Sequence, residues 1–160
     1  MAELEQEWLK GRSSLGAAAK WTAEEIRLVS ELGYSLAEQG RVEEAIALFE
    51  GLSALAPATA YFQAALGSLY LRDNQPEKAL KHLNYAIQFD AKDLFSLVNR
   101  GEAQLRTGKT EPALRDLRQA LQQGKFFKFD NEKETPLEKC LIRAKALLTT
   151  IEKFGIAKKQ

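Results

Sequence analysis

The side chains that could carry out chemistry are few in this chain. The sequence has one histidine, His82, and one cysteine, Cys140. A catalytic triad or a zinc site needs several such groups close together, and one histidine with one cysteine cannot supply them. The glycine-rich phosphate-binding motifs of nucleotide enzymes do not occur in the sequence either. We therefore predict no catalytic residue, no metal site and no cofactor, and expect His82 to be exposed and without a chemical role.

Paired carboxylates are the other residues that could act in acid–base chemistry. The pairs Glu24-Glu25 and Glu43-Glu44 each precede a run of apolar residues at helical spacing. Negative charge in the first turn of a helix is stabilised by the helix dipole. This structural role explains both pairs, so we predict that the chain is not an enzyme.

Charge and composition limit the kinds of partner. The net charge of the 160 residues is +1, with 14 basic and 17 acidic side chains in residues 1–123 and 9 and 5 in residues 124–160. This asymmetry is too mild for a nucleic-acid footprint. The acidic N-terminus lacks the apolar core of a signal peptide, and no apolar run reaches the length of a membrane span. We expect a cytoplasmic protein with no membrane and no nucleic-acid partner.

A glycine recurs every 34 residues, and other positions recur in step with it. The glycines are Gly33, Gly67 and Gly101. Each is followed after 12 residues by an alanine and after 16 by a large apolar residue: Ala45 and Phe49, Ala79 and Leu83, Ala113 and Leu117. Small residues let two antiparallel helices approach closely, and the bulky residue fills the space beside them. Residue types that accept the left-handed conformation at a helix end stand seven positions after the glycines: Gly40, Asn74 and Gly108.

A 34-residue unit of helix, tight turn and helix is the signature of the tetratricopeptide repeat, and the chain resembles that family. Thr22-Ala23-Glu24-Glu25 is a capping box that begins the first helix. The resemblance implies an all-α, right-handed superhelix of three helix pairs. The repeat domain is predicted over residues 22–127, with repeats at about 26–59, 60–93 and 94–127.

Another helix is predicted after the repeats end. Pro136 stands at its first position, and residues 136–153 carry one apolar stripe that includes Cys140. An end repeat exposes its apolar face unless something covers it. We expect a capping helix within a C-terminal segment of residues 128–160, with Cys140 as a small core residue.

A basic and aromatic cluster, Lys125-Phe126-Phe127-Lys128-Phe129, joins the last repeat to this helix. Such a cluster could stack on single-stranded nucleic acid. The alternative, which we favour, is that its phenylalanines are buried as a plug.

The N-terminal arm, residues 1–21, does not match the repeat. Leu4, Trp8 and Leu9 form a short apolar edge on it. Two alternatives stay open. The arm is a frayed tail, or it packs on another chain and makes a homodimer, as the enrichment of large aromatic residues at interfaces indicates for Trp8.

A second stripe on the first helix of each repeat is predicted to face the hollow of the superhelix. A contiguous apolar patch on such a surface is typical of a contact site for a protein or peptide. The alternative is that Tyr61 and Phe95 only pack between repeats. The predicted lining residues are Tyr34, Tyr61, Ala64, Ser68, Leu71, Phe95, Val98, Asn99, Glu102 and Leu105.

The whole chain is similar to the small tetratricopeptide chaperones of bacterial type III secretion, which hold hydrophobic translocator proteins. The stretches 65–70 and 86–90 resemble the second repeat of that class, whereas residues 100–104 depart from it. The resemblance implies a cytosolic chaperone that binds an apolar segment of a secreted partner. The alternative is a scaffold that joins subunits of a larger assembly through its outer face or its ends.

A different use of the fold, the clamp that grips acidic C-termini of heat-shock proteins, is not predicted. That clamp uses basic and asparagine side chains. Of the matching positions in this chain, only Asn99 has the required type; the positions are Ser30, Tyr34, Ala65, Phe95 and Asn99.

Overall fold

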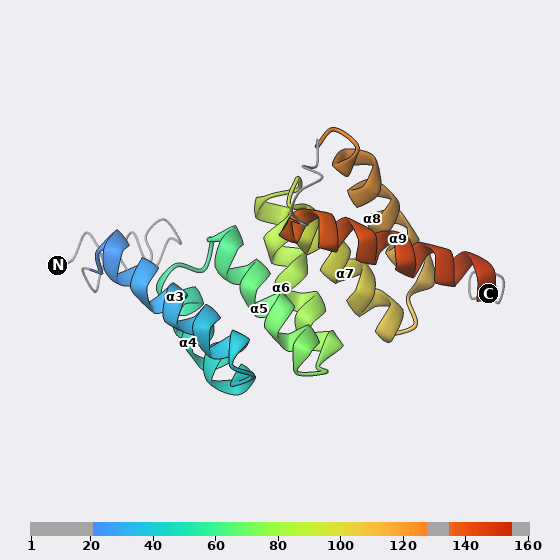
Figure 1. Ribbon diagram of the computed structural model, residues 1–160. Helices are drawn as coiled ribbons and strands as arrows, with labels where there is room; N and C mark the ends of the chain where they lie inside the picture. The colour runs from blue at the N-terminus through green and yellow to red at the C-terminus, as the bar shows by residue number, and fades with distance from the viewer. Residues whose placement is uncertain (1–20, 128–134, 155–160) are drawn as a thin grey trace.

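The computed structural model describes residues 21–127 and 135–154, and within these residues it contains helices and no strand. The helices are α3 (Ala23–Glu38), α4 (Val42–Leu55), α5 (Ala60–Arg72), α6 (Pro76–Phe89), α7 (Leu94–Arg106), α8 (Thr110–Gly124) and α9 (Pro136–Phe154). They follow one another along an elongated molecule (Figure 1). Each helix packs on the next in sequence, and α7 also packs on α5 and on α9. The predicted all-α superhelix of three helix pairs and a capping helix is confirmed.

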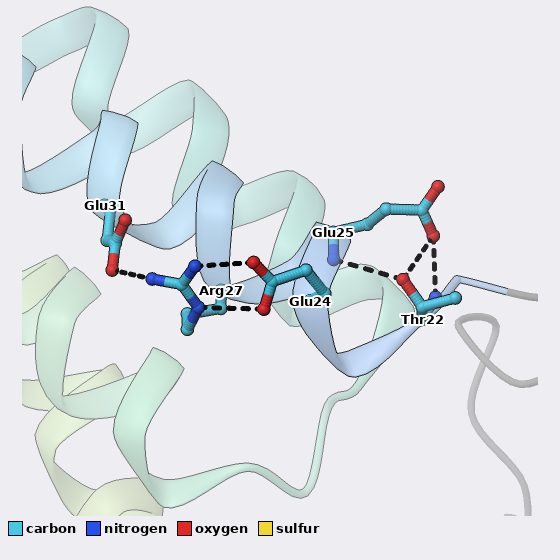
Figure 2. Close-up of polar contacts among 5 residues, drawn as sticks. All are labelled: Thr22, Glu24, Glu25, Arg27 and Glu31. Carbon is cyan, nitrogen blue, oxygen red and sulfur yellow. Dashed lines mark hydrogen bonds and ion pairs between the residues drawn. The ribbon is translucent and has the colours of Figure 1, made fainter.

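The first helix begins at the predicted capping box. The Thr22 backbone N–H donates to Glu25 Oε2 at 2.7 Å, and the Glu25 N–H donates to Thr22 Oγ1 at 3.2 Å (Figure 2). One turn later Arg27 pairs with Glu24 and Glu31 on the exposed face (Figure 2). Residues three and four apart meet on a helix surface, so these pairs support the first two turns of α3.

The turns inside the helix pairs use the residues that the spacing predicted. Gly40, Asn74 and Gly108 have φ angles of 80°, 55° and 77°. Only a residue that tolerates the left-handed region ends a helix in this way without strain. The second helix of each pair can therefore fold back directly on the first.

Close packing inside each pair depends on the recurring glycine. A Cβ atom built on Gly67 would lie 2.4 Å from Leu83 Cγ, and one on Gly101 would lie 2.9 Å from Leu117 Cγ. In the first pair a Cβ on Gly33 would lie 2.7 Å from the Phe49 ring. All three large partners have an exposed fraction of 0%. The predicted contact between a glycine helix and a large apolar residue is confirmed in all three pairs.

The buried apolar side chains form two clusters along the superhelix. The first is centred on α3 to α6. The second joins α7 and α8 to α9, which contributes Cys140, Leu141, Ala144, Leu148 and Ile151. Cys140 is 5% exposed, as expected for a small core residue. α9 thus covers the apolar face that the third pair would otherwise expose.

Two arginines link successive repeats through contacts that the repeat pattern does not predict. Arg72, at the end of α5, donates to the Ala37 carbonyl oxygen at 2.7 Å. Arg106, at the end of α7, donates to the Leu71 carbonyl oxygen at 3.1 Å. The last carbonyls of a helix have no partner within the helix, and a cation there also interacts favourably with the helix dipole. The two arginines are 34 residues apart, so they are a further element of the repeat.

Two expectations from the sequence are wrong. His82 is half-buried: its ring stacks on Tyr70 with centroids 5.4 Å apart, and its Nδ1 lies 2.8 Å from Gln63 Oε1. Phe126 and Phe127 form no plug, because they are 87% and 52% exposed.

Leu141 of α9 packs closely against the end of α8: a Cβ on Gly124 would lie 2.6 Å from Leu141 Cδ1. Leu141, rather than the exposed phenylalanines that follow α8, makes the contact there. Lys128 and Phe129 of that cluster, and Leu4, Trp8 and Leu9 of the N-terminal arm, lie outside the described residues.

Candidate functional site

The first helices of the pairs enclose a hollow of about 300 Å³, which we call the aromatic hollow. It extends over α3, α5 and α7, which follow one another along the molecule (Figure 1). Its lining residues are Tyr34, Ala37, Tyr61, Ala64, Ala65, Ser68, Leu69, Arg72, Asp93, Phe95 and Asn99.

Two tyrosines of the hollow are exposed at the edge and held rigidly from behind. Tyr34 and Tyr61 are 40% and 50% exposed, and their rings meet edge to face with centroids 5.9 Å apart. Behind them Tyr34 packs on Phe49 at 5.1 Å and Tyr61 on Phe62 at 5.8 Å. Both supporting rings are buried. Aromatic side chains fixed in this way present a large contact area and lose little conformational entropy when a partner binds.

Phe95 completes the aromatic lining from α7. Asp93 is the N-cap of this helix, and its carboxylate accepts hydrogen bonds from the Phe95 and Ser96 backbone N–H groups. The cap fixes the first turn of α7 and with it the position of Phe95. Phe95 is 42% exposed, so neither it nor Tyr61 is buried between repeats. This exposure favours a contact role over the alternative of packing between repeats.

The Tyr34 hydroxyl is uncharged at neutral pH. Burial, together with the neighbouring Tyr61 hydroxyl, raises the pKa of Tyr34 well above its usual value. Tyr34 therefore offers a ring and a neutral hydroxyl rather than a charge. The hollow is suited to an apolar side chain with polar groups beside it.

A second hollow of about 310 Å³ adjoins the first, and we call it the α9 hollow. It shares Ser68, Phe95 and Asn99 with the aromatic hollow. Its other wall comes from one face of α9: Pro136, Lys139, Cys140 and Arg143. Arg143 donates to Asn99 Oδ1, and its Nη1 lies 3.6 Å from Glu102 Oε2. Burial raises the pKa of the Cys140 thiol, so the sulfur in this wall is neutral.

The structure places six of the ten predicted lining residues in the aromatic hollow. They are Tyr34, Tyr61, Ala64, Ser68, Phe95 and Asn99. The other four have different positions. Leu71 and Val98 are buried at 6% and 0% exposure, Leu105 packs against the second core cluster, and Glu102 lies beside Arg106 and Arg143 in ion pairs.

Core packing accounts for these differences. Leu71 belongs to the first core cluster, and Leu105 packs against the second. Val98 is covered because it belongs to the core cluster that α9 completes.

Two basic residues of α9, Lys139 and Arg143, reach the α9 hollow but are not among the lining residues predicted from the sequence. The sequence predicts residues 136–153 only as a cap. The order of the helices could have indicated these two residues. A helix that follows a complete pair occupies the place of the first helix of a further pair, so one of its faces borders the hollow. Pro136, Lys139, Cys140 and Arg143 also have the i, i+3, i+4, i+7 spacing of one helix face.

Other kinds of site find no support in the part of the chain that the structure describes. Residues 21–127 and 135–154 contain no group of three or more side chains arranged to hold a metal ion. None of the described helices is both long enough and apolar enough to cross a bilayer.

Comparison with known proteins gives distant relatives. No protein-family model matches the chain. Hsc70-interacting protein 1 of Drosophila melanogaster is 30% identical over 131 residues, which make up 80% of this chain and 34% of that protein. The chain therefore spans about a third of the length of this curated relative.

Two solved structures share the arrangement of helices. One is the type III secretion chaperone SycD of Yersinia enterocolitica in complex with a peptide of the translocator YopD. Its TM-score is 0.70 at 19% identity, over 84% of this chain and 97% of that one. The other is the first TPR of Spaghetti (RPAP3) bound to the HSP90 peptide SRMEEVD, with a TM-score of 0.69 at 19% identity over 82% and 94% of the two chains. At these identities the likeness shows the fold.

Proposed function

We propose that this chain, which has the tetratricopeptide-repeat fold, is a protein-binding module whose aromatic hollow holds an apolar or amphipathic segment of another protein. The observation that carries the proposal is the exposure of Tyr34, Tyr61 and Phe95 around one hollow, at 40%, 50% and 42%. Clustered exposed aromatic residues on a protein surface are typical of contact sites.

The structural neighbours support a finer proposal. SycD, with the same fold, has been solved with a peptide of a translocator, and a TPR domain with a peptide of HSP90. For this chain we propose a small cytosolic chaperone that holds a hydrophobic segment of a secreted partner. The apolar lining of the aromatic hollow supports this choice.

The residues at the clamp positions do not support recognition of a heat-shock C-terminus in the known manner. Ser30 and Ala65 are both buried at 5% exposure, and Tyr34 and Phe95 present rings. Asn99 has the required type, but its amide oxygen already accepts a hydrogen bond from Arg143. The positions that would form the clamp thus lack the cationic groups that a free carboxylate needs.

The rival proposal is a scaffold that binds through its outer face. Tyr85 and Phe89, one turn apart on α6, are each 45% exposed and line neither hollow. They are the residues that such a scaffold would use. They also provide a matched control, because they are aromatic and exposed to a similar degree as the residues of the aromatic hollow.

The experiment is capture of partners by the immobilised full chain from extracts of its native cell, with identification by mass spectrometry. The affinity of the captured partner is then measured for single alanine variants. Tyr61→Ala and Phe95→Ala should each weaken binding about thirtyfold, because a buried aromatic anchor contributes about 2 kcal/mol or more. Tyr85→Ala and Phe89→Ala should leave it unchanged. The reverse pattern would support the scaffold instead.

A further inference from the structure

The α9 hollow indicates a second chemical feature of the bound segment, in addition to its apolar residue. This inference rests on the proposed function. We propose that the α9 hollow receives an aspartate or glutamate side chain of the same segment whose apolar residue occupies the aromatic hollow. The partner is thus an extended segment that carries an apolar residue and, a short distance along it, a carboxylate. In the bound segment, the acidic residue lies at the end nearer to α9.

Continuity between the hollows is the first support. Ser68, Phe95 and Asn99 line both, so the two hollows adjoin at these residues. An extended chain advances about 3.3 Å per residue with side chains pointing alternately to opposite sides. One short segment can therefore fill both hollows.

Charge is the second support. The two hollows are lined by three basic side chains, Arg72, Lys139 and Arg143, and by one acidic side chain, Asp93. The Asp93 carboxylate is already engaged as the N-cap of α7. Two of the basic residues, Lys139 and Arg143, belong to the wall that α9 supplies. A carboxylate that enters the α9 hollow lies beside the cationic side chains of Lys139 and Arg143, of which Arg143 also pairs with Glu102.

The position of Arg143 is the third support. Its guanidinium is oriented by Asn99 Oδ1 and by Glu102, whose carboxylate it shares with Arg106. The Arg143 side chain is nevertheless 45% exposed. A guanidinium has five N–H donors in a planar fork, which matches a carboxylate in geometry as well as in charge. Arg143 is thus held in place, while its side chain lines the hollow and stays partly exposed.

The test is a selection of random peptides displayed on phage, with the full chain as the target. The peptides are joined to the coat protein at their C-termini, so only side chains can supply a carboxylate. Wild-type chain should select peptides that combine an aromatic or leucine residue with a nearby aspartate or glutamate. Synthetic versions of a selected peptide, with an amidated C-terminus and either glutamate or glutamine at the acidic position, should differ about tenfold in affinity.

Substitutions in α9 test whether the α9 hollow causes this difference in affinity between the two peptides. The double variant Lys139→Gln, Arg143→Gln should bind the two peptides equally. Lys145→Gln is the matched control, because it removes a positive charge from the opposite side of the same helix, where Lys145 lines a different hollow with Ile142. The Lys145→Gln variant should keep the full difference in affinity between the glutamate and glutamine peptides. Urea denaturation of each variant establishes that the fold is retained.

Reversal of the charges on the wall of the α9 hollow should produce a new peptide preference, which loss of the fold could not produce. Lys139→Glu with Arg143→Glu should prefer a peptide with lysine at the acidic position. The preference of the wild type for glutamate should shrink in 1 M salt, where the Debye length is about 3 Å.

Failure of this inference and failure of the proposed function give different results. If the chain selects apolar peptides with no acidic enrichment, and Phe95→Ala weakens them, the inference is overturned and the proposed function stands. If Tyr61→Ala and Phe95→Ala bind the selected peptides as well as wild type does, or if no peptide is selected at all, both are overturned.

Discussion

At the scale of single residues, the glycine in the first helix of each pair sets how closely the two helices approach. The Cβ positions on Gly33, Gly67 and Gly101 fall within 3 Å of a completely buried side chain. Real Cβ atoms are not found so close to another atom, so the helices need a residue without one here. The neighbouring side chain cannot move away, because the core around it is densely packed.

Gly67→Ala should therefore lower the free energy of unfolding by about 1 to 3 kcal/mol, since overpacking of a core has costs in this range. Gly51→Ala is the control. Gly51 lies within α4, and a Cβ on it meets no atom within 4 Å. That substitution should raise the free energy of unfolding by about 0.5 to 1 kcal/mol, because alanine favours helix. Urea denaturation measures both, and equal effects would show that Gly67 is not a close contact.

His82 links stability to pH. Gln63 Nε2 donates to Ser53 Oγ and to the Pro57 carbonyl, which leaves Gln63 Oε1 to accept the Nδ1–H of His82. Burial, assisted by the charge of Lys81, lowers the pKa of His82 below its usual value. The unfolded chain then binds this proton more readily than the folded chain does.

The free energy of unfolding should therefore be highest above the unfolded pKa of about 6.5 and fall as the pH is lowered from there through the folded pKa. His82 is the only histidine, so few other groups titrate in this range. Urea denaturation at a series of pH values between 7.5 and 5 measures the slope. His82→Gln should reduce it, and an unchanged slope in that variant would contradict the assignment.

At the scale of the helix, α9 closes the core and extends the candidate site. One face of it covers α7 and α8 with Leu141, Ala144 and Ile151. The adjoining face carries Lys139 and Arg143 into the α9 hollow. A single amphipathic helix therefore connects the stability of the last repeat with the binding surface.

Ile151→Ala should lower the free energy of unfolding by about 2 to 5 kcal/mol, because Ile151 is 1% exposed and its loss leaves a cavity. Ile142→Ala on the same helix is the control. Ile142 is 53% exposed, and its loss should change stability by no more than about 0.5 kcal/mol. Thermal or urea unfolding compares the two, and similar losses would mean that α9 does not pack as described.

The elements were predictable from the sequence because their signals are local and repeated. The 34-residue spacing predicted which glycine contacts which large residue, and the residues at the turns predicted where each helix ends. Contacts between repeats were harder to predict. Arg72 and Arg106 bond carbonyls of the preceding repeat, and the burial of Val98 depends on α9. These follow from how the pairs stack, which no local pattern in the chain specifies.

At the scale of the whole molecule, the stacked pairs bring the first helices to a common hollow. The residues of the aromatic hollow come from three helices that are far apart in sequence, with Tyr34 on α3, Tyr61 on α5 and Phe95 on α7. The sequence predicted Tyr61 and Phe95 because they share one position of the repeat, and Tyr34 because it lies on the same stripe, seven residues after the matching position in the first repeat. It predicted the C-terminal part of the surface less well, since α9 follows the last repeat without the 34-residue spacing.

The most direct measurement of the central claim is photo-cross-linking of the captured partner. Benzoylphenylalanine replaces one aromatic residue at a time, so that size and apolar character are kept. If the partner lies in the aromatic hollow, variants at Tyr61 and Phe95 cross-link to it, and variants at Tyr85 and Phe89 on α6 do not. Cross-links from Tyr85 and Phe89, with none from Tyr61 and Phe95, would contradict the account and place the partner on the outer face.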